Sequence, residues 1–162
     1  LSKPLLLLVA SPTTGVSNIV NNCRALSISP LVKALIIDDN NITVKMLLKI
    51  LTKEFGHLTS CTASGKEALN KLSLETFNII FMDIDIPELF GIETTLAIHS
   101  TGSKVLKNNQ QIPIIAYITN PWKDQYFKAG MNGWVEKPAS QSTVRQELDR
   151  VMLLNKGLHA IS

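Results

Sequence analysis

Apolar stretches alternate with amphipathic stretches along most of the chain. Five short segments are apolar or rich in β-forming residues and have the length of strands: 34–37, 57–62, 78–82, 112–118 and 134–137. Five others are helix-prone, mostly with apolar residues at helical spacing: 44–55, 64–72, 91–100, 122–130 and 141–154. The polar stretch 101–111 reads as a long connecting loop. The alternation predicts an α/β fold, a doubly wound parallel sheet whose central strands are buried on both faces.

Residues 1–30 precede this alternation and predict an accessory strand and helix. The apolar run at 5–10 is too short to span a bilayer and has only a thin basic region before it for a signal peptide. Residues 14–26 have helical spacing, and 27–30 read as a linker. We therefore divide the chain into an accessory segment (1–30), an α/β domain (31–155) and a tail (156–162). Because position 1 is Leu, we expect a fragment of a longer chain or a processed product.

Size, charge and cysteine content narrow the function classes. The 162 residues, 45% of them hydrophobic, suit one domain with a full core. The net charge of +3 comes from dispersed basic residues, which argues against nucleic-acid binding. Cys23 and Cys61 are too few for a disulfide framework, so we expect a reducing compartment, cytoplasmic or nuclear. Because the apolar run at 5–10 is too short to span a bilayer, we expect no membrane association. The histidines at 57, 99 and 159 are too scattered for a triad or a metal cluster.

Charged residues stand at or just past the ends of three predicted strands. Asp38 and Asp39 follow the first strand, Asp83 follows the third, and Lys137 ends the fifth. Ligands of doubly wound sheets gather at the carboxyl ends of the strands, so these groups should converge. Clustered carboxylates repel one another unless a cation compensates, and magnesium is the hard cation that accepts carboxylate and phosphate oxygens. A carboxylate can also act as the nucleophile, so we predict an aspartate-phosphorylation site.

Each of these residues also has a simpler interpretation. Asp38 and Asp39 could interact with the dipole of the following helix. Asp85, two residues beyond Asp83, could be an acid in a turn before Pro87. Lys137 could be a solvated loop lysine. Their joint placement at strand ends favours the phosphorylation site.

Several motifs occur in the order found in one family. They are ALIIDDN, SGKEAL, IIFMDIDIPELFGIE, IPIIAYIT and AGMNGWVEKP, within residues 33–154. Through them the chain resembles the receiver domain of two-component response regulators, of a eukaryotic or fungal type. The resemblance implies a flavodoxin-like sheet of order 2-1-3-4-5. It also implies a phosphorelay role, with a histidine phosphotransfer protein or histidine kinase as donor and an effector protein downstream.

The resemblance assigns roles to the clustered residues. Asp83 would accept the phosphoryl group from a phosphohistidine. Its side chain would also contact Mg²⁺. Asp39 would bind Mg²⁺ directly, Asp38 largely through water, and Asp85 through its backbone carbonyl. The Asp85 side chain would tune the lifetime of the phosphate.

Other site positions carry over in the same way. Lys137 would hold the phosphate, and Pro138 would follow a cis peptide bond that aims this lysine. Gly91 would shape the loop after the acceptor strand. Such a domain phosphorylates itself and slowly dephosphorylates itself, without being an enzyme in the usual sense.

The sequence departs from the family at the positions that couple phosphorylation to a conformational switch. The family's hydroxyl residue at the end of the fourth strand falls on Ile118, and the neighbouring Thr119 would point to the other face unless the strand is bulged. Trp134 stands where the family usually has Tyr or Phe. The loop between Thr119 and Lys137 is also shorter than usual.

Two other functions stay open. Ile118 and the short loop would suit a pseudo-receiver, which acts as a constitutive interaction module. The pair Asp83 and Asp85 resembles the two-acid motif of haloacid dehalogenase-type phosphatases, although Asp38 and Asp39 count against that class. The resemblance also allows homodimerisation through residues 122–154.

Overall fold

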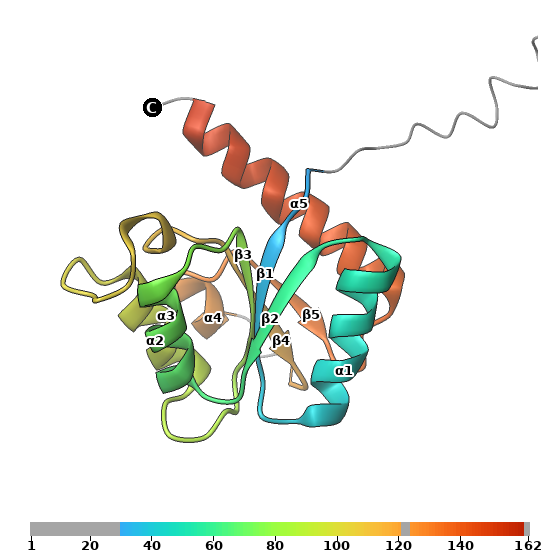
Figure 1. The fold of residues 1–162 in the computed structure, drawn as a ribbon, viewed down its shortest axis with the longest axis horizontal. Helices are drawn as coiled ribbons and strands as arrows, with labels where there is room; N and C mark the ends of the chain where they lie inside the picture. Colours follow the sequence, from blue (N-terminus) through green and yellow to red (C-terminus); the bar gives the residue numbers. More distant parts are fainter. Residues whose placement is uncertain (1–29, 121–123, 161–162) are drawn as a thin grey trace, which may run out of the picture. The chain divides into compact units, whose positions relative to one another are not determined.

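A five-stranded parallel sheet forms the centre of the computed structural model, which describes residues 30–120 and 124–160 (Figure 1). Its order is β2-β1-β3-β4-β5, as the family resemblance implies. The strands are β1 (Lys33–Ile37), β2 (Leu58–Thr62), β3 (Ile79–Asp83), β4 (Ile114–Ile118) and β5 (Gly133–Glu136). The helices are α1 (Asn41–Lys49), the π-helical turn η2 (Ile50–Glu54), α2 (Gly65–Leu74), α3 (Gly91–His99), the 3₁₀ turn η3 (Lys107–Asn109), α4 (Asp124–Lys128) and α5 (Gln141–Ala160). The predicted strand 5–10 and helix 14–26 lie outside the described residues.

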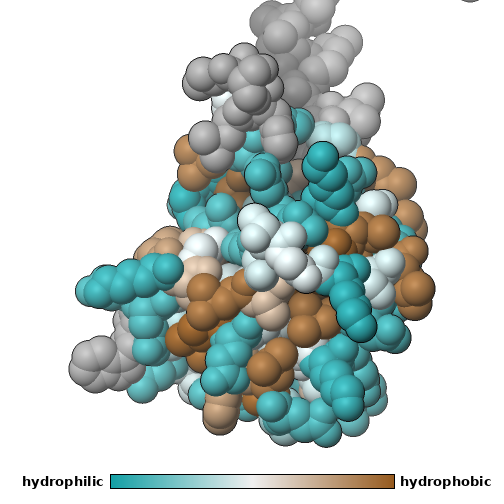
Figure 2. All heavy atoms as spheres, turned by 90° about the vertical axis from the view of Figure 1, so that its left-hand side faces the viewer, coloured by the Kyte–Doolittle hydropathy of each residue, from teal (hydrophilic) through white to brown (hydrophobic). Residues whose placement is uncertain are grey.

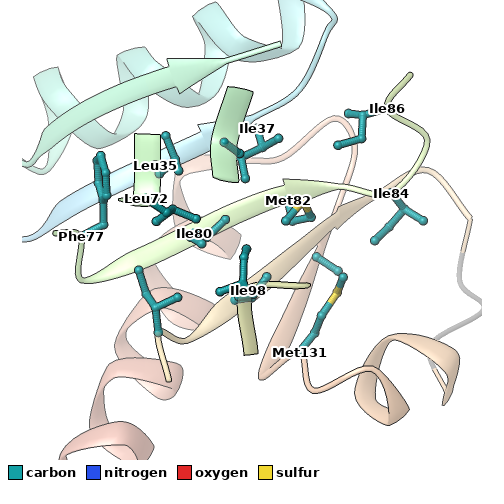
Figure 3. Packing of buried hydrophobic residues seen from close by; sticks show 14 of the residues in the cluster. Leu35, Ile37, Leu72, Phe77, Ile80, Met82, Ile84, Ile86, Ile98 and Met131 are labelled. Atoms are coloured by element: carbon teal, nitrogen blue, oxygen red, sulfur yellow. The ribbon is translucent and has the colours of Figure 1, made fainter. Parts of the chain in front are cut away.

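Both faces of the sheet are buried, and each has its own hydrophobic cluster. Side chains alternate along the strands, so Leu35 and Ile37 of β1 face one cluster while Ala34 and Ile36 face the other. Helices α2, α3 and α4 cover the first cluster, which Figure 3 shows around Met82. Helices α1 and α5 cover the second (Figure 1). This layering explains why the predicted strands read as nearly continuous apolar runs.

The helix ends explain most differences from the predicted boundaries. Helix α1 begins three residues before the predicted start because the Asn40 side chain accepts hydrogen bonds from the backbone N–H groups of Ile42 and Thr43. Helix α4 ends in a Schellman motif, in which Gly130 has a left-handed φ of +100° as the predicted C′ residue. Helix α5 continues to Ala160 and takes in most of the predicted tail. An isolated glycine such as Gly157 weakens a helix without ending it.

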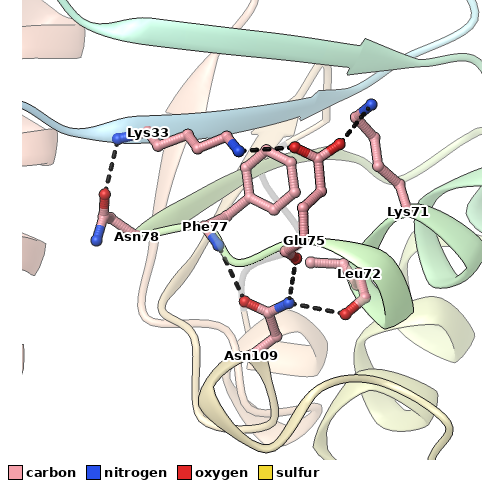
Figure 4. A network of polar contacts seen from close by, with 7 residues as sticks. All are labelled: Lys33, Lys71, Leu72, Glu75, Phe77, Asn78 and Asn109. Carbon is pink, nitrogen blue, oxygen red and sulfur yellow. Dashed lines mark hydrogen bonds and ion pairs between the residues drawn. The ribbon is translucent and has the colours of Figure 1, made fainter.

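The segment between α3 and β4 was predicted as a polar loop, and it is anchored in the core. Val105 and Asn109 are buried. The Asn109 amide donates to the carbonyl oxygens of Leu72 and Glu75 at the end of α2, and its oxygen accepts from the Phe77 N–H (Figure 4). One side chain therefore ties this loop to the end of α2 and the start of β3.

The outer surface of α2 and α3 carries scattered apolar side chains. Leu74 and Leu96 are exposed there, and Figure 2 shows hydrophobic patches separated by hydrophilic ones on this side of the molecule. Within the described ranges 30–120 and 124–160, no helix is both long and apolar enough to cross a membrane.

Candidate functional site

Two neighbouring strands bring the predicted acids together. Asp83 is the last residue of β3, and Asp38 follows β1 directly. Because β1 and β3 pair in parallel, with Ile37 opposite Met82, the residues that come next lie side by side at the carboxyl edge. Asp38 and Asp83 are both buried, whereas Asp39 is exposed.

Lys137 joins the two buried carboxylates. Its Nζ lies 2.8 Å from Asp38 Oδ2 and 2.9 Å from Asp83 Oδ2. The lysine follows β5, at the far side of β4 from Asp83, so its side chain has to reach across the top of the sheet. The structure thus brings together Asp38, Asp83 and Lys137 from three separate strands, as the sequence predicts.

Backbone groups hold the functional side chains in place. The N–H of Asn40 donates to Asp38 Oδ1 at 2.8 Å, and the N–H of Asp85 donates to Asp83 Oδ1 at 3.3 Å. The Lys137 N–H donates to the Ile118 carbonyl at 2.7 Å, which continues the pairing of β4 with β5 beyond the strand ends. The Lys137–Pro138 peptide bond is cis.

Gly91 permits a close approach of α3 to the end of β3. It begins α3, and its N–H donates to the Ile84 carbonyl at 3.1 Å. A Cβ at this position would collide with the Asp83 carbonyl oxygen and would lie 2.9 Å from Ile84 Cα. The absence of a side chain therefore lets α3 start directly against the end of β3.

Burial and ion pairing shift the pKa values of Asp38 and Lys137 in opposite directions. Burial raises the pKa of Asp38, and the hydrogen bond from Lys137 lowers it only in part. Burial alone would lower the pKa of Lys137, but its hydrogen bonds to Asp38 and Asp83 outweigh that effect and raise the pKa. The lysine is therefore a firmly charged ammonium that compensates the buried acids.

Three carboxylates are close enough to share a cation. Oxygen atoms of Asp38, Asp39 and Asp83 all lie within 4.8 Å of one another. Hard divalent cations such as Mg²⁺ take oxygen ligands of this kind and usually keep several waters, and exposed Asp39 leaves the site open to solvent. The donor set therefore fits a magnesium ion.

The remaining predicted positions surround this centre. Asp85 is exposed just beyond Asp83, and Thr119 is exposed just beyond β4. Ile118 is buried in the cluster under α2, α3 and α4, and half-buried Trp134 packs against the same cluster. Position 118 thus places an aliphatic side chain in the core and no hydroxyl at the site.

The sequence predicts Tyr117 as a packing or partner-surface residue and not as part of the site, whereas the structure places it beside the site. Tyr117 lies opposite Asp83 in the pairing of β3 with β4, and its ring centroid is 5.0 Å from Lys137 Nζ. The available signal was side-chain alternation: if Ile118 points to one face of the sheet, Tyr117 must point to the other.

One protein-family model covers most of the described residues. The sequence model of the response regulator receiver domain matches residues 34–149. Among curated proteins, the chain is 27% identical over 139 residues to Probable histidine kinase 6 of rice, covering 75% of this chain and 14% of that protein. It is 32% identical over 142 residues to Hybrid signal transduction histidine kinase E of Dictyostelium discoideum, covering 82% of this chain and 8% of that protein. The chain thus spans a small part of these much longer relatives.

Solved structures share the same architecture. The chemotaxis response regulator CheY4 of Vibrio cholerae is 26% identical, with a TM-score of 0.65 over 75% of this chain and 99% of that one. The receiver domain of sensor histidine kinase PA1611 from Pseudomonas aeruginosa, described with a magnesium ion in its active-site cleft, is 22% identical. Its TM-score is 0.63, over 76% of this chain and 98% of that one, and at this identity the likeness concerns the fold alone.

Proposed function

This chain belongs to the response regulator receiver domain family, and from that premise we propose that it accepts a phosphoryl group on Asp83. The observation that carries the proposal is the position of Lys137 Nζ between Asp38 and Asp83, with the Asp39 carboxylate in the same cluster. A carboxylate beside a fixed ammonium can attack phosphorus while the incoming negative charge is compensated.

The proposed reaction moves one phosphoryl group from nitrogen to oxygen. A carboxylate oxygen of Asp83 forms the new O–P bond while the P–N bond of a phosphohistidine breaks. The leaving imidazole nitrogen keeps the electron pair of that bond and takes up a proton from solvent. The Lys137 ammonium, which already contacts the Asp83 carboxylate, would pair with an oxygen of the transferred group.

Magnesium completes the proposed site. Asp38, Asp39 and Asp83 would hold it, together with the backbone carbonyl of Asp85, because oxygen donors are what this ion accepts. When bound, it would neutralise part of the charge that three acids and a phosphoryl group bring together. The three side chains would bring the metal to the edge of the sheet where the acceptor ends β3.

The relatives support a proposal for the donor of the phosphoryl group. Histidine kinases and hybrid histidine kinases are among the proteins that this chain resembles. We therefore propose that a histidine kinase or a histidine phosphotransfer protein supplies the phosphoryl group. A downstream effector protein would read the phosphorylated state.

A second function, that of a pseudo-receiver, is favoured by one observation. Ile118 is 2% exposed and packs in the apolar cluster against which Trp134 also packs, so position 118 offers no hydroxyl that could follow a phosphoryl group. Such a domain would present a constant surface to its partner whether or not Asp83 is modified.

Intact-mass analysis with a small phosphodonor separates these functions. The parent, Asp83→Asn and the matched control Asp149→Asn, which alters an exposed acid of α5 outside the site, are incubated with phosphoramidate with and without Mg²⁺. We expect one phosphoryl adduct on the parent and on the control, dependent on Mg²⁺ and absent from Asp83→Asn. No adduct on folded parent would reject the acceptor function in favour of the pseudo-receiver, and turnover of phosphate esters would indicate a phosphatase.

A further inference from the structure

An aromatic ring lies against the ammonium that joins the two buried acids. Tyr117 is 2% exposed and belongs to the cluster between the sheet and helices α1 and α5. Its ring centroid is 5.0 Å from Lys137 Nζ, within the range in which a cation is attracted to the face of an aromatic ring. Because the ring is buried, little water screens this attraction.

The backbone holds Lys137 close to the strand that carries the ring. The Lys137 N–H donates to the carbonyl oxygen of Ile118, the residue next to Tyr117 in β4, at 2.7 Å. Tyr117 itself lies opposite Val135 of β5, two residues before Lys137. The end of β4 and the residues that follow β5 are thus held together beside the ring.

We propose that Tyr117 is a positioning residue for Lys137. Its ring holds the ammonium at the site by a cation–π contact and keeps it there while Asp83 changes from carboxylate to acyl phosphate. This inference rests on the proposed phosphorylation of Asp83. A tyrosine stands at this position where an aliphatic residue would bury comparable apolar surface without attracting a cation.

The contact between the Tyr117 ring and the Lys137 ammonium matters because the ion pair of Lys137 with Asp83 changes during the reaction. Before transfer, Lys137 Nζ is held by Asp38 and Asp83 carboxylate oxygens. Formation of the acyl phosphate removes the carboxylate charge of Asp83, so that ion pair weakens as the new phosphoryl oxygens appear. The attraction of the ring does not depend on the state of Asp83, and an ammonium has three N–H donors with which to turn toward a phosphoryl oxygen.

Two substitutions at position 117 and one control test the proposal. Tyr117→Phe keeps the ring and removes the hydroxyl, whereas Tyr117→Leu removes the ring. Ile115→Ala deletes a buried side chain from the same face of β4, two residues away, and leaves the ring in place. All are compared by circular dichroism and urea unfolding, and kinetics are measured at a temperature at which each variant is folded.

The kinetic readout is the rate of adduct formation with phosphoramidate, followed across Mg²⁺ concentrations. We expect Tyr117→Leu to lower the maximal rate about tenfold without weakening the apparent Mg²⁺ affinity, since the carboxylates remain. Tyr117→Phe should recover most of the rate, and Ile115→Ala should keep it despite reduced stability. A folded Tyr117→Leu protein with the parental rate, or an equal fall in Tyr117→Leu and Ile115→Ala, would overturn the proposal.

A double-mutant cycle in urea unfolding tests the contact without phosphorylation. Tyr117→Leu, Lys137→Met and the double variant should show coupling, on the order of a several-fold factor in the folding equilibrium constant. Additive changes in the free energy of unfolding would overturn the proposed contact between Tyr117 and Lys137. If the parent forms no adduct, the acceptor function fails and the cycle alone decides about Tyr117. If the parent is phosphorylated but the Tyr117 variants behave like the parent, only this inference fails.

Discussion

The Asn109 side chain should contribute strongly to stability although it lies far from the proposed phosphorylation site. It is fully buried, and it accepts from the Phe77 N–H at 3.0 Å while donating to the carbonyl oxygens of Leu72 and Glu75 at 2.8 Å each (Figure 4). We predict that Asn109→Ala lowers the free energy of unfolding by about 3 kcal/mol.

This magnitude follows from the groups that lose a partner. The buried Phe77 N–H loses its acceptor, at a cost of about 2 kcal/mol. The partly buried Glu75 carbonyl loses a donor, at about 1 kcal/mol. The Leu72 carbonyl adds little to the cost because it also accepts from the Leu106 N–H at 3.0 Å.

Urea unfolding followed by circular dichroism measures the effect, with Asn108→Ala as the matched control. Asn108 is the exposed neighbour in the same 3₁₀ turn, so its replacement should change stability by no more than about 0.5 kcal/mol. Phe77 lies before the start of β3 whereas Asp83 ends it, so folded Asn109→Ala should phosphorylate normally. A difference of less than about 1 kcal/mol between the two variants would refute this reasoning.

Three further changes probe other parts of the molecule. Gly91→Ala should lower the free energy of unfolding by about 1–3 kcal/mol, because the new Cβ would collide with the Asp83 carbonyl; a neutral result in urea unfolding would contradict the close approach. Burial and then the charge of Arg145 lower the pKa of His57, so protonation favours the unfolded chain. Stability should therefore fall as the pH drops below about 6.5, and His57→Gln should show a smaller fall in urea titrations across that range; equal pH dependence in both proteins would be inconsistent with a buried neutral imidazole. Ile118→Thr should cost about 2 kcal/mol in urea unfolding, since it buries a hydroxyl in an apolar cluster, and an unchanged midpoint would show that the site is more polar than its neighbours indicate.

Much of the fold is encoded in local patterns that can be read along the chain. Strands such as β3 and β4 are continuous apolar runs because both of their faces are buried. The start of α1 was missed because apolar periodicity begins at Val44, whereas the helix is capped by Asn40. Asparagine is a good N-cap, so that signal was present and was not used.

The long-range contacts were not readable in the same way. Asn109 looks like one amide among several in a polar stretch, and its partners are 32 to 37 residues away. In the sequence, Tyr117 looks like an ordinary core aromatic. Its contact with Lys137 becomes visible only when the path of the lysine side chain across the sheet is known. The acids of the site were predictable because topology alone places strand ends at one edge, whereas Tyr117 required the side-chain geometry.

The most direct test of the central claim is chemical identification of the modified residue. After phosphorylation in the presence of Mg²⁺, the protein is treated with borohydride, which reduces an acyl phosphate of aspartate to homoserine, and its peptides are sequenced by mass spectrometry. We expect homoserine at position 83 and unchanged aspartate at positions 38, 39 and 85. Homoserine at another position, or a phosphoryl group that survives reduction on a histidine or hydroxyl side chain, would contradict the central claim.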